Sequence, residues 1–219
     1  MISRRDGYVR GAGKEQLSIA ILQKFFKTMI GSSGETILGA QDNYENGDLR
    51  FPTGATIECK GQPIDPNRYQ QNFVEVFEVT NNPKHDEGFK RLGDVLRITP
   101  DRLAKIPVTF GSTKDSLGRQ TRVSLSVLSM HHASYTAYVN YEDAGRFIYL
   151  YEQDEIVNLV REAVLKGLRR GAGNSNEDTF SVFVPIAKMR WGRLGSDWVY
   201  EGVGSEVGKL EVLKSLLAG

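Results

Sequence analysis

Cysteine, long apolar runs and excess charge of one sign are all scarce in this sequence, and each shortage excludes a class of protein. Cys59 is the single cysteine among 219 residues, so the chain forms no internal disulfide and carries no cysteine-rich zinc site. No apolar run approaches the roughly 20 residues needed to span a bilayer, and the basic start over residues 1–11 lacks the apolar stretch of a secretory signal. We therefore expect no membrane association and a cytoplasmic location.

The net charge of +1 and the pI near 7.8 do not by themselves indicate a nucleic-acid-binding domain, for which a pI above about 9 is common. The distribution of charge says more. Basic residues cluster near the amino end and again over 166–193, whereas residues 31–48 contain no lysine or arginine. This separation suits a site that binds a cation and a polyanion together, although scattered surface charges produce similar runs by chance.

Helix-like and strand-like patterns alternate irregularly along the chain, which predicts a mixed α/β fold. Ile19, Leu22, Phe26 and Met29 recur at helical spacing and predict a first helix, over 14–30, that ends before Gly31. We expect a central mixed β-sheet flanked by helices. The other predicted helices cover 86–96, 101–106, 154–168 and 206–217; the predicted strands cover 48–51, 55–60, 72–80 (with a helix left open there), 122–130, 134–141, 146–151 and 179–185; and 167–178 is predicted to be a loop.

The first two predicted strands bring acidic and basic side chains together. Pro52–Gly54 between them carries turn chemistry, so the strands should form an antiparallel hairpin. Residues two apart on a strand share a face, so Glu58 and Lys60 point the same way while Cys59 points into the other layer. Hairpin pairing can bring Asp48 beside Glu58, so that two carboxylates and an ammonium converge.

Such a cluster has the composition of a divalent-metal site. Mg²⁺ prefers oxygen ligands and is commonly held by one or two carboxylates, together with phosphate oxygens and waters. A lysine at the edge of the cluster can orient or help deprotonate a water, or neutralise charge that develops on a phosphate. Asp48, Glu58 and Lys60 are therefore candidate catalytic residues, with Mg²⁺ as the expected cofactor and Mn²⁺ as its substitute.

This arrangement resembles the PD-(D/E)XK nuclease superfamily, which includes many restriction endonucleases and Holliday-junction resolvases. The matching residues are Asp48 in GDLRF, followed by Glu58 and Lys60 in IECKG. The resemblance implies that the acidic pair binds the metal with the backbone carbonyl of Cys59, and that the lysine activates water. It also implies that a glutamate from the first helix, here Glu15, assists, and that the core is restriction-endonuclease-like with additional strands and helices.

The resemblance covers roughly residues 14–80. It implies a single nuclease domain over 1–219, with a catalytic core at about 14–110. We expect residues 111–219 to add DNA-contacting loops and a dimer surface. The sequence departs from the family pattern before the aspartate, where Gly47 stands in place of the usual proline.

Each of these site residues also has a structural interpretation. Glu58 and Lys60 could form an exposed cross-strand charge pair on a solvated hairpin. Asp48 could shape a turn after Asn46-Gly47. Glu15 could cap the first helix, because carboxylates are favoured in a first turn.

Two polar segments, 111–122 and 188–193, carry side chains suited to DNA. Arginine and glutamine can bind base edges in the major groove, and lysine binds phosphates. Plain surface loops are the alternative interpretation. The candidate DNA-binding residues are Lys114, Arg119, Gln120, Arg122, Lys188, Arg190 and Arg193.

Together these features predict a Mg²⁺-dependent endonuclease that hydrolyses phosphodiester bonds of double-stranded DNA. A type II restriction-like enzyme that cuts at a specific sequence ranks first, because the material beyond the core is extensive enough for sequence recognition. A homodimer is expected, since two single-site subunits can cut both strands. The alternative is a structure-selective nuclease, such as a Holliday-junction resolvase or repair nuclease. A non-catalytic DNA-binding or scaffolding module is the second alternative.

Overall fold

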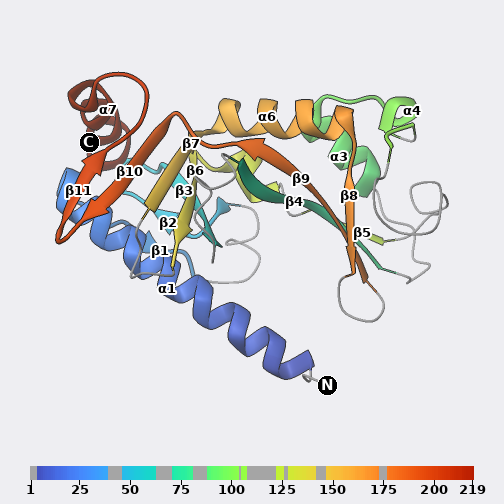
Figure 1. Ribbon diagram of the computed structural model, residues 1–219, viewed down its shortest axis with the longest axis horizontal. Helices are drawn as coiled ribbons and strands as arrows, with labels where there is room; N and C mark the ends of the chain where they lie inside the picture. The colour runs from blue at the N-terminus through green and yellow to red at the C-terminus, as the bar shows by residue number, and fades with distance from the viewer. Residues whose placement is uncertain are drawn as a thin grey trace. The chain divides into compact units, whose positions relative to one another are not determined.

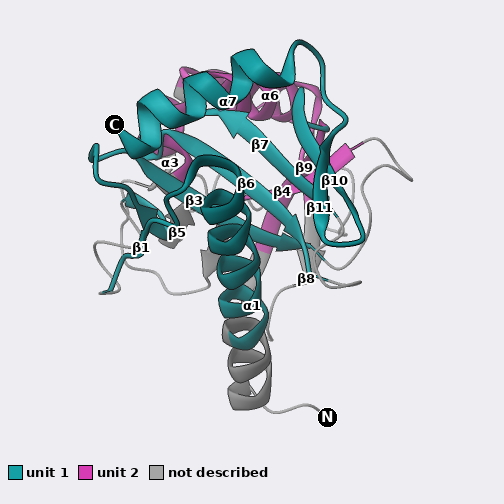
Figure 2. Ribbon diagram, turned by 90° about the vertical axis from the view of Figure 1, so that its left-hand side faces the viewer, with its two compact units in different colours: residues 1–70, 132–153, 186–219 teal, residues 71–131, 154–185 magenta. Residues whose placement is uncertain are grey.

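The computed structural model, whose helices and strands are labelled in Figure 1, divides into two compact units that are each built from separate stretches of the chain (Figure 2). Unit 1 comprises 1–70, 132–153 and 186–219, and unit 2 comprises 71–131 and 154–185. No helix in the described part of the chain is long and apolar enough to cross a membrane. The structure describes residues 4–38, 46–62, 71–80, 88–103, 105–107, 122–125, 128–141, 147–172 and 177–219.

Unit 1 contains a seven-stranded mixed sheet with the order β1-β2-β3-β6-β7-β10-β11. β3 and β6 pair in parallel, and the other neighbours pair antiparallel. The mixed α/β class with a central sheet flanked by helices is thus confirmed. The elements of this unit are α1 (Arg4–Ile30), β1 (Glu35–Thr36), β2 (Leu49–Arg50), β3 (Thr56–Gln62), β6 (Tyr135–Asn140), β7 (Phe147–Glu152), β10 (Met189–Leu194), β11 (Asp197–Tyr200), α7 (Glu206–Leu213) and the π-helical turn η3 (Lys214–Ala218).

One face of this sheet packs against α1 and the C-terminal helix, as Figure 2 shows for α1. α1 begins at Arg4, earlier than the predicted residue 14, and ends where Gly31 adopts a φ of 79°. Phe25 of α1 contacts Trp191 and Trp198 through its ring. The apolar contacts of this face form the core of unit 1, which includes Leu22, Phe25, Phe26 and Ile30 from α1, Ile57, Cys59, Ala137, Val139, Ile148, Leu150, Met189 and Trp191 from the strands, and Leu213 and Leu217 from the C-terminal helix.

The predicted hairpin of 48–51 and 55–60 is confirmed as β2 and β3. Leu49 pairs with Ile57, and the turn is closed by a 2.9 Å hydrogen bond from the Phe51 N–H to the Ala55 carbonyl. Gly54 has a φ of 87°, a backbone conformation that favours glycine. The short hairpin therefore fixes which residues of β3 face Asp48.

Unit 2 is built around a four-stranded antiparallel sheet with the order β5-β4-β9-β8. A register shift between Glu75 and Phe77 lets Val76 and Phe77, although adjacent, both be buried. The longest helix of this unit, α6, buries Ile156, Val160 and Val164. The elements are β4 (Gln71–Thr80), α3 (Gly88–Leu96), α4 (Pro100–Leu103), β5 (Arg122–Leu125), α5 (Leu128–His132), α6 (Gln153–Lys166), β8 (Arg169–Ala172) and β9 (Glu177–Pro185).

The structure corrects four expectations from the sequence. Segment 72–80 is a strand as predicted, β4, but it belongs to the second sheet instead of continuing the first. Part of the predicted loop over 167–178 is strand β8, which pairs with β9. The predicted strand over 122–130 ends at residue 125, and Leu128–His132 form helix α5. Most of the polar segment 188–193 belongs to strand β10, whose Met189 and Trp191 are buried. For β4, β8 and β10, strand pairing or burial outweighed the local sequence signal.

Candidate functional site

Asp48 lies against β3 through both its backbone and its side chain. Its N–H donates to the Ile57 carbonyl at 2.9 Å, and its Oδ2 accepts a hydrogen bond from the Cys59 N–H at 2.7 Å. The residue is only 2% exposed. The hairpin register and these two bonds place a buried carboxylate beside the Glu58–Lys60 segment, so Asp48 does more than shape a turn.

The residue before Asp48 is glycine, and the backbone conformation there is one that a proline could not adopt. Gly47 has a φ of 88°, whereas proline holds φ near about −65°. A Cβ at this position would lie 2.9 Å from the Ile57 carbonyl oxygen and 3.0 Å from the Glu58 nitrogen. The chain therefore approaches β3 too closely for any side chain at residue 47, and this approach delivers Asp48 to the site.

Glu58 and Lys60 form an ion pair along β3, between Glu58 Oε1 and Lys60 Nζ. Glu58 is 4% exposed, whereas the lysine side chain is 36% exposed. The interpretation of a solvated cross-strand pair is wrong, because the carboxylate is buried and both residues belong to one strand. A buried carboxylate is unfavourable unless it is paired, and here Lys60 is its partner. Buried charged groups of this kind are common at functional sites.

Glu15 lies on α1, well inside the helix, so the capping interpretation is wrong. The helix passes very close to β3: a Cβ on Gly61 would lie 2.6 Å from the Ser18 hydroxyl oxygen. This approach holds Glu15 within electrostatic range of the hairpin while it stays accessible to solvent. Partial loss of hydration raises the pKa of Glu15, the charge of Asp48 raises it further, and Lys60 opposes both.

The pKa of the Cys59 thiol depends on its burial and on all of these charges. Burial raises its pKa well above the ordinary value, and the carboxylates of Asp48, Glu58 and Glu15 add to the effect, while Lys60 lowers it. The pKa of Cys59 is thus influenced by four ionisable side chains, one from α1, one from the residue before β2 and two from the opposite face of β3. Cys59 itself is a small buried residue of the apolar face, as its neutral thiol allows.

The donor chemistry of this cluster fits a hard divalent cation: two buried carboxylates, with the Cys59 carbonyl between Glu58 and Lys60 in the chain. The present arrangement differs from a formed ligand shell. Among the described residues, no group of three or more His, Cys, Asp or Glu side chains is placed to hold one ion. Glu58 is engaged by Lys60, so it would have to exchange this partner to become a metal ligand.

A neighbouring strand adds polar residues that sequence reasoning missed. In the parallel β3–β6 pairing, Thr136 lies opposite Glu58, and Asn140 lies opposite Gln62. Paired residues share a face of a sheet, so β6 presents these side chains on the same face as the Glu58 carboxylate. The alternation in 135–140 could have indicated two faces, but only the parallel pairing identifies the one that meets Glu58.

The structure describes only part of the predicted DNA-contacting surface. Lys188 is exposed, and Arg190 and Arg193 are half-buried. The Nε of Arg193 donates to the Gly195 carbonyl at 3.0 Å. Trp191, between these two arginines in the sequence, is a buried core residue. Lys114, Arg119 and Gln120 lie outside the residues that the structure describes. Arg122 is the first residue of β5, and only its backbone is described.

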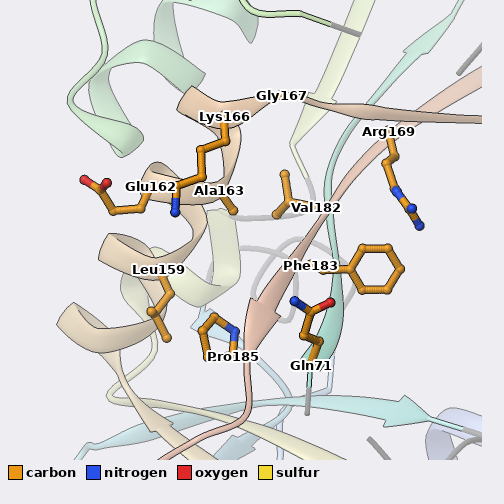
Figure 3. A pocket seen from close by; sticks show the side chains of 10 residues that line it. All are labelled: Gln71, Leu159, Glu162, Ala163, Lys166, Gly167, Arg169, Val182, Phe183 and Pro185. Atoms are coloured by element: carbon orange, nitrogen blue, oxygen red, sulfur yellow. The ribbon is translucent and has the colours of Figure 1, made fainter. Parts of the chain in front are cut away.

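Unit 2 has a pocket of about 380 Å³ that contains none of the predicted site residues (Figure 3). Leu159 and Ala163 of α6 and Val182 of β9 are among its walls. Lys166 and Glu162 bring charges of opposite sign to it. The pocket and the charged cluster on β3 are therefore separate features.

No family model matches the chain, and no curated protein or solved structure matches it either. The case for a function therefore rests on the chemistry of the Asp48, Glu58 and Lys60 cluster.

Proposed function

We propose that this protein is a metal-dependent nuclease that hydrolyses phosphodiester bonds of DNA. The observation that carries the proposal is a pair of almost fully buried carboxylates at the β2–β3 hairpin: Asp48 accepts a hydrogen bond from the Cys59 N–H, and the adjacent Glu58 is paired with Lys60. Burying two like charges is unfavourable unless a cation offsets them. Lys60 offsets one, and a divalent cation would offset both while offering a phosphate oxygen a ligand position.

Asp48, Glu58 and the Cys59 carbonyl would hold Mg²⁺ or Mn²⁺. When bound, such an ion supplies a Lewis acid for the phosphate and lowers the pKa of a water. Lys60 is paired with Glu58, and its side chain is 36% exposed. Its ammonium group can therefore orient the attacking water or neutralise developing negative charge. Glu15 lies at the rim, where its raised pKa suits a group that takes up a proton or joins the ion.

Duplex DNA cut at a specific sequence by a homodimer is the form of this function that we favour. Arg190 supports only DNA binding within this proposal, because β10 places it in register with Tyr149, and through Tyr138 with Lys60, on one face of the sheet. A cation on the same face can contact the DNA backbone beside the cleaved bond. A structure-selective nuclease and a non-catalytic DNA-binding module remain the alternatives that the experiments below separate.

The central test is incubation of the protein with plasmid, linear duplex and branched DNA, with Mg²⁺, with Mn²⁺ and with EDTA. Discrete fragments from the linear duplex support the restriction-like form, and cleavage of branched DNA alone supports the structure-selective form. Binding without cleavage under every condition would contradict the nuclease. Glu211→Gln is the matched control, because this exposed carboxylate pairs with Lys214 on the C-terminal helix.

The number of protein chains per DNA duplex and the residues that contact the DNA phosphates are tested separately. Sedimentation with DNA in Ca²⁺, which suppresses cleavage, should give two protein chains per duplex, and a one-to-one complex that cuts both strands would exclude the dimer. Neutralising Lys188, Arg190 and Arg193 should reduce the salt slope of binding by about one unit for each lost phosphate contact. An unchanged slope would place the DNA on another face.

A further inference from the structure

Two buried polar atoms on β6 have no hydrogen-bond partner within the described part of the chain: the Thr136 hydroxyl oxygen and Asn140 Oδ1. Thr136 is 0% exposed and Asn140 is 4% exposed. A buried polar group without a partner is unfavourable and is uncommon in folded proteins. Two of them on one short strand therefore call for an explanation.

The sheet register places both atoms next to the Glu58–Lys60 ion pair. Thr136 is the direct partner of Glu58 in the parallel pairing, and Tyr138 is the partner of Lys60. Asn140 lies one step farther along the same face, diagonal to Lys60. Neighbouring strands lie about 4.8 Å apart, so a carboxylate reaches its direct neighbour and a long lysine reaches a diagonal one.

The hydrogen-bonding characters of the two atoms match the two members of the ion pair. A hydroxyl can donate to a carboxylate, and an amide oxygen can accept from an ammonium. In the ion pair, Glu58 and Lys60 are engaged with each other. When the ion pair separates, each member would have a complementary buried atom on β6 that has no other hydrogen-bond partner in the described part of the chain.

We propose that Thr136 and Asn140 receive Glu58 and Lys60 when a divalent cation separates the pair. The Thr136 hydroxyl then donates to Glu58 and orients it as a ligand, while Asn140 Oδ1 accepts a hydrogen bond from Lys60 and holds it beside the attacking water. Both are positioning residues, since they act through Glu58 and Lys60. The inference rests on the proposed function, because it assumes that the cation binds at this cluster.

The decisive variant is Thr136→Val, which keeps the shape of the side chain and removes the hydroxyl. Because the hydroxyl has no hydrogen-bond partner among the residues that the structure describes, the thermal midpoint of unfolding without metal should be equal to or above that of the wild type. Mn²⁺ affinity, measured by calorimetry without DNA, should fall about 10–100-fold, as for other residues that orient a metal ligand. Thr136→Ser, which restores the hydroxyl, should bind Mn²⁺ like the wild type.

The Asn140 half of the proposal is tested with Asn140→Leu and Asn140→Asp. The leucine variant should bind Mn²⁺ almost normally but should lower the cleavage rate and shift its pH profile, because Lys60 loses its acceptor. The aspartate variant keeps an acceptor and should retain more activity than the leucine variant. Equal pH profiles for the wild type and the leucine variant would contradict this half.

The outcomes separate the inference from the proposed function. Wild-type protein that neither binds Mn²⁺ nor cleaves DNA contradicts both. Wild-type protein that does both, with Thr136→Val indistinguishable from it, contradicts the inference alone. A Thr136→Val variant that is less stable without metal, or that fails to fold, also contradicts it, because the hydroxyl would then have a structural partner in the free protein.

Discussion

The two faces of the seven-stranded sheet are made by alternate residues of the same strands, yet they differ in composition. The face toward α1 carries apolar side chains such as Ile57, Val139 and Leu150. The opposite face carries Glu58 and Thr136, and the same register adds further polar and aromatic side chains to it, namely Lys60, Tyr138, Asn140, Tyr149, Tyr151 and Arg190. Because side chains alternate with a period of two, one register decides both faces at once.

The apolar face stabilises the fold, whereas the polar face carries the residues proposed to act in cleavage. The α1 face gains free energy from buried apolar area, whereas the opposite face buries a carboxylate and two atoms that have no hydrogen-bond partner among the described residues. Strained or unsatisfied groups persist where the rest of the structure stabilises them and a function uses them. The faces should therefore respond in opposite ways to substitution.

The largest effect is expected on the polar side of this comparison. Asp48→Asn and Glu58→Gln should each reduce DNA cleavage by at least about 10³-fold, or ~4 kcal/mol, because each removes a negative charge from the proposed metal ligands. Folding and most DNA affinity should survive, since phosphate contacts elsewhere dominate binding. Cleavage assays and gel-shift titrations of the same preparations measure the two properties.

Lys60→Met gives a related result of similar size. The rate should fall by orders of magnitude, while metal binding is kept or strengthened because a competing cation is gone. Near-normal turnover in any of these three variants would show that the substituted residue is not part of the proposed active centre.

On the apolar face the effect should be on stability alone. Leu150→Ala, in the core of β7, should lower the free energy of unfolding by about 2–5 kcal/mol through lost contacts and a residual cavity. Urea unfolding measures this loss. The fraction that remains folded should cleave DNA at a normal rate per molecule, and a large drop in that rate would mean that the two faces are not separable.

Gly47 allows the chain to approach β3 closely, and this approach brings Asp48 against β3. Gly47→Ala should destabilise the protein by about 2 kcal/mol or more, since the Cβ meets the backbone of Ile57 and the positive φ disfavours a side chain. Gly54→Ala is the matched control, with a similar φ but open space around its Cβ. If both variants lose the same stability, the close approach at Gly47 has no cost of its own.

The smallest effect is expected at Glu15. Its pKa is raised above the ordinary value of 4.5, so between the unfolded and folded pKa values the native protein binds more protons than the unfolded chain. Stability contributed by this group is therefore present at low pH and is lost as pH rises through the folded pKa. In the absence of metal, Glu15→Gln should gain no more than about 0.5 kcal/mol relative to the wild type above that pH, because solvent screens the rim. Urea midpoints measured from pH 4 to 7 for both proteins test the sign, and a gain that is larger at pH 4 than at pH 7 would contradict it.

Local sequence signals were sufficient for the elements of the candidate site. The turn residues of Pro52–Gly54 predicted the hairpin, and the period of two predicted that Glu58 and Lys60 share a face while Cys59 joins the other layer, as the structure has it. Helical spacing located the apolar side of α1 but not its start. Strand β10 escaped prediction because its charged residues mask Met189 and Trp191, which are buried in the core that α1 covers.

The sequence by itself determined that a carboxylate and a lysine stand two residues apart on a strand, with a second carboxylate one short hairpin away. The tertiary structure alone decided that these carboxylates are buried, that α1 brings Glu15 within range, and that β6 lies parallel to β3 with Thr136 beside Glu58. The physical reason is distance along the chain. Alternation and turn chemistry act over a few residues, whereas the pairing of β3 with β6 joins segments that are separated by more than 70 residues and depends on the packing of the whole sheet.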